Sequence, residues 1–257
     1  MRPRYRIQFP PDDVGTLGQD EVFFYLVEDG ERRKIRLHDY GAMYSVPGLY
    51  EQVVYERLKC QSPAKVRDVL LSTVQQGEHR FTERRVLDFG AGNGMAGEVI
   101  HEEGVARLVG VDIIPEALEA AERDRPDVYD AFYVADFCKL SAEEREELLS
   151  WSFDCLVTVA ALGFGDIPPR AFMEAYNLID RHGWVAFNIK ETFLDRSDTT
   201  GFSRLIRELM FSRFLKLSHL ERYRHRLSAD GKPIYYYAFG GQKLDHVPEE
   251  FLEDFAV

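Results

Sequence analysis

The sequence feature that most constrains the fold is an apolar segment that runs directly into a glycine-rich turn. The segment VLDFGAGNGMAG spans residues 86–97, and a second apolar segment further along ends on Asp112. This order predicts a strand, a tight turn, a helix and a second strand. Gly90, Gly92 and Gly94 leave no Cβ between the backbone and a ligand, and the helix N-terminus behind them offers free N–H groups. With an acid placed to accept from two ribose hydroxyls, the pattern predicts a nucleoside-cofactor site.

Two kinds of cofactor are compatible with the glycine-rich turn. Gly92, Gly94 and Gly97 satisfy the spacing G-x-G-x-x-G, and Asp112 lies about 20 residues further on, as in dinucleotide-binding sites. Asp88, however, lies inside the first predicted strand. A carboxylate there would repel a pyrophosphate but attract a cofactor that carries an ammonium and a sulfonium.

A third acid favours the second kind of cofactor. Asp136 follows another predicted strand, and Asp88, Asp112 and Asp136 are evenly spaced along the chain. The loop D-F-G-A-G-N-G with these acids resembles the first motif of the class I S-adenosylmethionine-dependent methyltransferases. The resemblance covers roughly residues 84–243. It implies that Asp88 serves the amino-acid end of the cofactor, that Asp112 binds the ribose, and that Asp136 meets the adenine amino group.

The resemblance implies an α/β fold with a doubly wound, seven-stranded, mostly parallel sheet that ends in an antiparallel hairpin, a Rossmann-like arrangement. The chain shows apolar segments suited to five core strands over residues 86–89, 107–111, 132–135, 153–162 and 184–189. Residues 219–227 and 233–241 predict the terminal hairpin. A dinucleotide-binding sheet would instead continue in parallel.

The first part of the chain precedes this core. We expect an N-terminal extension over residues 1–80 and a cofactor-binding core over residues 81–257. Alternating apolar residues predict a β-hairpin with strands over residues 21–27 and 32–38. Two later stretches, residues 48–60 and 62–76, predict helices. The last of these has Ser62 as its expected N-cap.

Ligands of open α/β sheets gather outside the carboxyl ends of the strands. The residues expected to bind the cofactor are Asp88, Gly90, Ala91, Gly92, Gly94, Asp112, Ile113, Asp136, Phe137, Ala160, Tyr40 and Tyr44. Ile113 and Phe137 are placed to lie against the two faces of the adenine, with core packing as the alternative for each.

The segment at residues 37–50 is polar and aromatic and lies just before the core. In related small-molecule methyltransferases, an N-terminal segment with tyrosines often covers the cofactor, which makes Tyr40 and Tyr44 candidates for such a cap. The alternative is that these tyrosines pin the extension to the core. His38 and Asp39 are candidate proton acceptors, and Lys190, after a predicted strand, is a third catalytic candidate.

The terminal hairpin carries three arginines at alternating positions, Arg222, Arg224 and Arg226, which predicts that they share one face of a strand. Such a ladder can hold a carboxylate or phosphate of a substrate. The alternative is a sheet edge that is protected by charge.

Composition narrows the function classes. A net charge of −12 argues against a nucleic-acid partner, whose phosphates need a basic surface. No apolar run approaches the roughly 20 residues that span a bilayer, and the first residues lack a signal-peptide core, so we expect a cytoplasmic protein without a membrane partner. No His/Cys cluster has metal-ligand spacing, and no metal is expected.

The sequence therefore predicts methyl transfer from S-adenosylmethionine to a small-molecule acceptor, with S-adenosylhomocysteine as product. Residues 160–169 lack the Asn/Asp-Pro-Pro-aromatic signature of amino-directed DNA methyltransferases, so we set that activity aside. Two alternatives stay open: a non-catalytic S-adenosylmethionine-binding regulator or subunit, and an NAD(P)-dependent oxidoreductase. The acceptor and the oligomeric state are left open.

Overall fold

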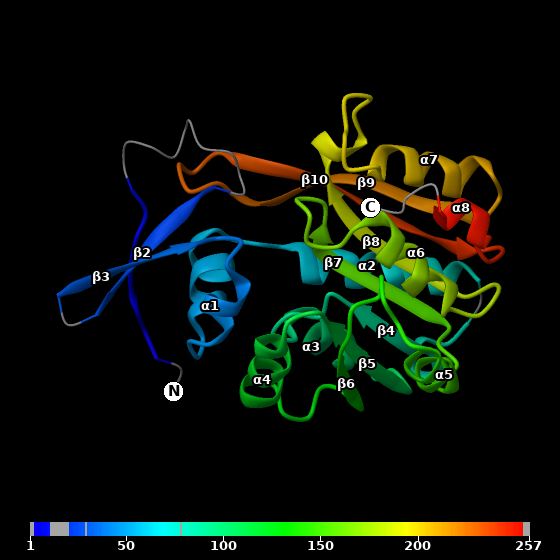
Figure 1. Cartoon of the computed structure of the whole chain (residues 1–257), viewed down its shortest axis with the longest axis horizontal. Coiled ribbons are helices and arrows are strands. Elements are labelled where there is room, and N and C mark those ends of the chain that lie inside the picture. Colours follow the sequence, from blue (N-terminus) through cyan, green and yellow to red (C-terminus); the bar gives the residue numbers. More distant parts are fainter. Residues whose placement is uncertain (1–2, 11–20, 29, 78, 254–257) are drawn as a thin grey trace.

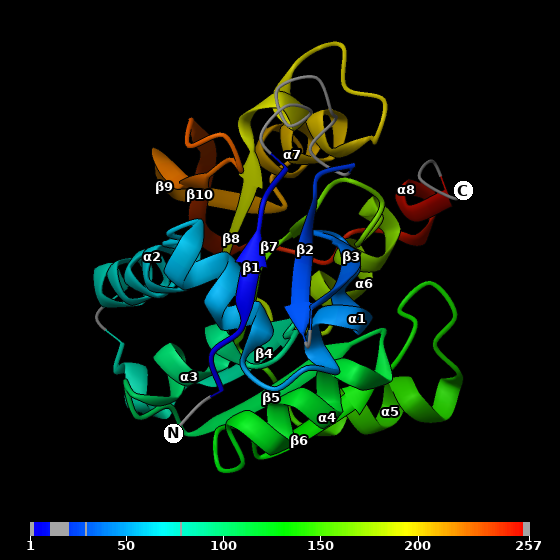
Figure 2. The ribbon, with the colours of Figure 1, turned by 90° about the vertical axis from the view of Figure 1, so that its left-hand side faces the viewer.

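The computed structural model describes residues 3–10, 21–28, 30–77 and 79–253. The described chain forms a small antiparallel sheet and a larger sheet with helices on both faces (Figures 1 and 2). The larger sheet is built from seven strands: β4 (Arg85–Phe89), β5 (Arg107–Asp112), β6 (Ala131–Val134), β7 (Cys155–Leu162), β8 (Trp184–Lys190), β9 (Leu215–Leu227) and β10 (Pro233–Lys243).

The order of these strands is β6-β5-β4-β7-β8-β10-β9. The first five strands in this order are parallel to one another, whereas β10 runs antiparallel to both β8 and β9. The predicted fold class, a mostly parallel seven-stranded sheet with an antiparallel terminal hairpin, is confirmed. Strand order reverses beside β4, so the expected ligand position is outside the carboxyl ends of β4, β5 and β7.

Alternate side chains of the strands supply two separate apolar cores. Leu87 and Leu156 pack on one face of the sheet, and Val86 and Val157 pack on the other. The first face is covered by α5 (Ala142–Ser150), α6 (Pro169–Asn177) and α7 (Phe202–Phe211). The second is covered by α2 (Ser62–Gln76) and α3 (Met95–His101). Helix α4 (Pro115–Asp124) lies beside β5 and β6, and helix α8 (Glu249–Glu253) lies near the C-terminus (Figure 1).

Helix α2, which we expected to belong to the extension, packs on the main sheet through Val66, Leu70 and Val74. The expectation that Ser62 is its N-cap is wrong, because Gln61 occupies that position. The Ser62 hydroxyl lies instead within 2.6 Å of Tyr223 and of His225, so a tertiary contact takes the group that would have capped the helix.

The extension forms a unit with its own core. The predicted hairpin is confirmed as β2 (Phe23–Glu28) and β3 (Glu31–Arg36), and β1 (Arg6–Gln8) adds a third strand that the sequence did not reveal. The short helix α1 (Tyr40–Tyr44) follows. The helix expected over residues 48–60 is a π-helix, η1 (Glu51–Arg57). Two 3-10 turns complete the secondary structure, η2 (Phe81–Glu83) and η3 (Glu191–Leu194).

This unit lies beside the carboxyl ends of the parallel strands, and α1 lies next to α4 (Figures 1 and 2). The far end of the β9–β10 hairpin reaches toward the same unit (Figure 1). Among the described helices, none is both long and apolar enough to cross a membrane.

Candidate functional site

A cavity of about 690 Å³ lies where the carboxyl ends of the parallel strands meet the extension and the terminal hairpin. Twelve of the residues predicted from the sequence line it: His38, Asp39, Tyr40, Tyr44, Gly90, Ala91, Gly92, Asp112, Ile113, Asp136, Phe137 and Ala160. Asp88, Gly94 and Lys190 are not among the lining residues. The structure thus brings most of the predicted set together around one space.

The glycine loop after β4 is fastened to β5. The backbone N–H groups of Gly90 and Ala91 both donate to the carbonyl of Val111, at 2.9 and 3.0 Å. Gly92 has a φ of +54°, and a Cβ on it would lie 2.5 Å from the Tyr44 hydroxyl. Glycine is therefore required at this position both for the backbone conformation and for the close approach of the tyrosine.

Asp112 organises the loop and also faces the cavity. Its carboxylate accepts from the N–H groups of Gly92 and Ile113, both at 2.8 Å, and of Ile114 at 3.2 Å. Burial raises the pKa of Asp112, and these hydrogen bonds oppose the rise. A carboxylate offers about four acceptor positions, so capacity remains for a hydroxyl in the cavity.

The residues predicted to surround an adenine differ in their surroundings. Ile113 is 56% exposed, which is unusual for a large apolar side chain next to a cavity and leaves its face open to a ligand. Phe137 is 3% exposed and packs on Phe89 with ring centroids 4.6 Å apart, so it also serves the core. Asp136 accepts from the Cys138 N–H at 2.9 Å, and this hydrogen bond lowers its pKa.

Asp88 stands apart from the other two acids. It is fully buried behind the loop, where one carboxylate oxygen accepts from the Tyr129 hydroxyl at 2.7 Å and the other has no hydrogen-bond partner. Burial raises its pKa to about 7. Gly94, at the N-terminus of α3, faces the side chains of Arg125 and Tyr129. The predicted contacts of these two residues with the cofactor stay predictions.

Tyrosines of the extension form an aromatic wall of the cavity. The rings of Tyr40 and Tyr44 are stacked with centroids 6.0 Å apart, and Tyr50 meets Tyr44 edge-on at 5.0 Å. Burial raises the pKa of all three hydroxyls, which keeps them neutral. Because Tyr44 lies directly over Gly92, the wall covers the glycine loop.

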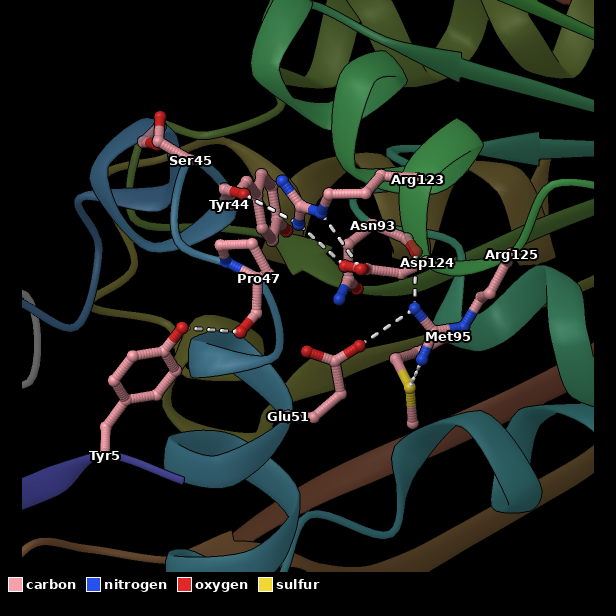
Figure 3. A network of polar contacts seen from close by, with 11 residues as sticks. Tyr5, Tyr44, Ser45, Pro47, Glu51, Asn93, Met95, Arg123, Asp124 and Arg125 are labelled. Carbon is pink, nitrogen blue, oxygen red and sulfur yellow. Dashed lines mark hydrogen bonds and ion pairs between the residues drawn. The ribbon is translucent and has the colours of Figure 1, made fainter. Parts of the chain in front are cut away.

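Arg123 of α4 and Arg125, which directly follows this helix, fix the wall to the core (Figure 3). Arg123 donates to the backbone carbonyl of Tyr44 at 3.0 Å. Arg125 pairs with Glu51 of the π-helix at 2.9 Å and donates to the carbonyl of Asn93 in the glycine loop at 2.8 Å. One side chain therefore holds both the extension and the loop. The placement agrees with a covering role for the tyrosines and with a pinning role.

The three catalytic candidates lie in different settings. The Nδ1 atom of His38 is 3.6 Å from a carboxylate oxygen of Asp166, and both residues line the cavity. Asp39 accepts from the Ala42 N–H as the N-cap of α1, which occupies part of its carboxylate. The ammonium of Lys190 lies 5.2 Å from the centre of the Phe164 ring, outside the cavity lining.

Asp166 was missed as a functional residue. Its only signal in the sequence is its position in the segment after the central strand β7, where ligand-contacting loops are expected. The pairing with His38 depends on the extension and could not be read from the sequence.

A buried polar network supports the turn after β7. Ala160 has a φ of +57°, and its N–H donates to the Asn188 side chain at 2.6 Å. Asn188 donates in turn to the Ser62 hydroxyl at 2.9 Å, which lies 2.6 Å from Nδ1 of His225. The network connects the central strands, α2 and the terminal hairpin, and it ends on a histidine that lines the cavity.

The prediction that the three hairpin arginines share one face is wrong. Arg222 pairs with Glu191 at 2.7 Å near the surface, whereas Arg226 is buried and lines the cavity beside His225. The register of β9 against β10 shifts within this stretch, so strict alternation fails there.

Comparisons with known proteins identify the core. Residues 87–187 match the family model described as methyltransferase domain. The chain is similar in structure to the N-methyltransferase NodS from Bradyrhizobium japonicum in complex with S-adenosyl-L-homocysteine, with a TM-score of 0.54 and 15% identity over 81% of this chain and 98% of that chain. It is also similar to magnesium protoporphyrin IX methyltransferase from Synechocystis with bound S-adenosylhomocysteine, with a TM-score of 0.50 and 14% identity over 70% of this chain and 82% of that one. No curated protein matches the chain.

Proposed function

We propose that this chain, whose residues 87–187 match the methyltransferase-domain family model, is a class I S-adenosylmethionine-dependent methyltransferase, and that its acceptor is a small molecule bound in the cavity between the sheet and the extension. S-adenosylmethionine, when bound, supplies a methyl group that its positively charged sulfur already activates. The protein must hold the acceptor in line with that methyl group and keep water out.

The observation that carries the proposal is the shape of the site. One cavity of about 690 Å³ contains both the predicted cofactor residues and a set of polar side chains that the cofactor motif does not need. This volume lies within the roughly 300–1,000 Å³ that is usual for small-molecule sites. The tyrosine wall covers the cavity, which supports a small acceptor over a large polymer surface.

Residues of the sheet edge fit the nucleoside part of the cofactor. Asp112 retains acceptor capacity toward the cavity for the ribose hydroxyls. Asp136 lines the same space at the end of β6 and is suited to an adenine amino group, and the open face of Ile113 is suited to the adenine ring. The neutral rings of Tyr40 and Tyr44 present aromatic faces, which attract a sulfonium.

His38 is the best-placed proton acceptor among the predicted candidates. It lines the cavity, and the Asp166 carboxylate at 3.6 Å can orient its ring. If the acceptor atom carries a proton that must leave, His38 would take it, and proton transfer of this kind contributes about 10²–10⁴-fold to a rate.

The proposal is tested by measuring S-adenosylhomocysteine release with panels of small amines, phenols, thiols and carboxylic acids. We expect release with at least one class of acceptor, and about 100-fold slower release by His38→Gln for an acceptor that loses a proton. His101→Gln, which changes an exposed histidine on α3, is the matched control. Binding of S-adenosylhomocysteine without turnover of any acceptor would favour a cofactor-binding regulator instead.

The cytoplasmic location and the lack of a nucleic-acid partner remain predictions from the composition. The acidic total charge supports both a small acceptor and weak affinity for nucleic acids.

A further inference from the structure

A β-bulge in the terminal hairpin turns two consecutive side chains toward the cavity. Arg224 pairs with Tyr235 and Arg226 pairs with Ile234, so His225 is the extra residue of β9. Bulges break the alternation of a strand and redirect side chains, and they are frequent next to active sites. As a result, His225 and Arg226 are both buried, at 4% and 6% exposure, and both line the cavity.

Arg226 has no acidic partner among the residues that the structure describes. Its Nη1 atom donates to the carbonyl of Leu227 at 2.9 Å, and no Asp or Glu of the described residues forms a salt bridge with it. Arginine is a cationic side chain, and a buried charge without a partner is strongly unfavourable. The arrangement therefore calls for a negative group from outside the protein.

The other buried arginines of the described chain show the contrast. Arg84 pairs with Asp154 at 3.0 Å, and Arg125 pairs with Glu51 at 2.9 Å. In these two cases the protein supplies the counter-charge itself. Arg226, with a comparable degree of burial, faces a cavity instead.

The surroundings of Arg226 suit an anion. Tyr40 and Tyr50 line the same cavity, and burial raises the pKa of their hydroxyls, so they remain available as neutral donors. Asp112 and Asp136 line the cavity from the sheet edge and would repel a negative group there. Arg226 thus offers an anion a site at the hairpin side of the cavity, while Asp112 and Asp136 stand at the sheet edge.

We infer that Arg226 binds a carboxylate or phosphate group of a ligand in this cavity, an inference that rests on the proposed function. Two sources of that chemistry exist: the carboxylate on the amino-acid part of the cofactor, and an anionic group on the acceptor. Arginine suits either group, because its planar fork donates two parallel hydrogen bonds to a pair of oxygens.

The experiment compares wild type with Arg226→Met in calorimetric titrations with S-adenosylhomocysteine and with 5′-methylthioadenosine, which lacks the amino-acid part. Each protein is then saturated with S-adenosylhomocysteine and titrated with acetate and with inorganic phosphate, followed by the NMR signals of the arginine side chains. Arg224→Met is the matched control, because it removes an equal charge from the same strand outside the cavity lining. Melting temperatures establish that each variant folds, and Arg226→Lys provides a second, milder change.

If the cofactor supplies the anion, Arg226→Met weakens binding of S-adenosylhomocysteine by about 10- to 100-fold and leaves 5′-methylthioadenosine unaffected. If the acceptor supplies it, both nucleosides bind as before, and only proteins with Arg226 bind acetate or phosphate. Unchanged binding of all probes would overturn the inference, and so would an equal loss of both nucleosides in a folded variant. Failure of the wild type to bind either nucleoside would contradict the proposed function, while the anion titration, repeated without nucleoside, still tests Arg226.

Discussion

Asp112 has two tasks at the scale of single residues, since it both shapes the glycine loop and faces the cavity. We predict that Asp112→Ala weakens S-adenosylhomocysteine binding by about 10- to 100-fold, because hydrogen bonds to a charged group contribute about 1.5–3 kcal/mol. Calorimetry measures the loss, and the melting temperature separates it from unfolding. Unchanged affinity in a folded variant would remove Asp112 from the site.

Gly92 is predicted to tolerate no side chain. Gly92→Ala should weaken binding at least about 10-fold, since the new Cβ would lie 2.5 Å from the Tyr44 hydroxyl at a φ of +54°. Adding Tyr44→Phe should restore part of the affinity, and Gly92→Val should abolish binding. Gly165→Ala is the control, because Gly165 also lines the cavity at positive φ but has no neighbouring atom within 4 Å of its added Cβ. Equal losses in the two alanine variants would contradict the steric explanation.

Asp88 gives the fold a pH dependence. Burial raises its pKa from 3.8 to about 7 in the folded state, so between these values the folded protein holds a proton that the unfolded chain releases. The stability that this proton contributes is present at low pH and is lost as the pH rises toward about 7. Asp88→Asn, whose amide oxygen can still accept from Tyr129, should therefore raise the free energy of unfolding relative to wild type more at pH 8 than at pH 5. Urea unfolding at the two pH values tests this prediction, and Glu143→Gln, which changes an exposed carboxylate, is the control. If Asp88→Asn changes the free energy of unfolding equally at pH 5 and pH 8, Asp88 does not titrate between these values.

At the scale of elements, the open question about the extension is whether it covers the cofactor or only holds itself against the core. Tyr44 covers the glycine loop, while Arg123 and Arg125 tie the segment to α4 (Figure 3). A segment that closes over a cofactor should become more protected when the cofactor is present. We predict that S-adenosylhomocysteine slows amide hydrogen exchange over residues 37–50, and that Tyr44→Ala lowers turnover more than it lowers the melting temperature. Identical exchange with and without ligand would mean that the segment only pins the extension to the core.

The elements that the sequence predicted well are those with a strong local pattern. The central strand β7 is a continuous apolar run, and α5 begins with a capping box between Ser141 and Glu144 that the structure contains. Strand β1 was missed because three residues are too short for any periodicity to show. The π-helix η1 was expected as an ordinary helix, since its apolar spacing does not distinguish the two.

The site was predictable only where one segment carries the chemistry. The glycine loop and Asp112 belong to one βαβ unit, so their proximity follows from local structure. The pairing of His38 with Asp166 joins segments that are distant in sequence, and the inward turn of Arg226 depends on a bulge. We expected Arg226 to lie on the same face of β9 as Arg222, because no residue in that strand signals the shift in register.

At the scale of the whole molecule, three parts of the chain enclose one cavity. The parallel sheet supplies the glycine loop and the acids, the extension supplies the tyrosine wall and His38, and the terminal hairpin supplies His225 and Arg226. Asp112 and Asp136 line this cavity at the sheet edge, whereas Arg226 lines it from the hairpin and has no acidic partner among the described residues. This arrangement matches a ligand that has a nucleoside at one end and a polar or charged group at the other.

The most direct test of this account is a crystal structure of the protein with S-adenosylhomocysteine. We predict ligand density in the cavity, with the ribose hydroxyls on Asp112, the adenine against Ile113 and the sulfur facing the space beside Tyr44 and His38. Density for the nucleoside outside this cavity, or a ribose without contact to Asp112, would contradict it.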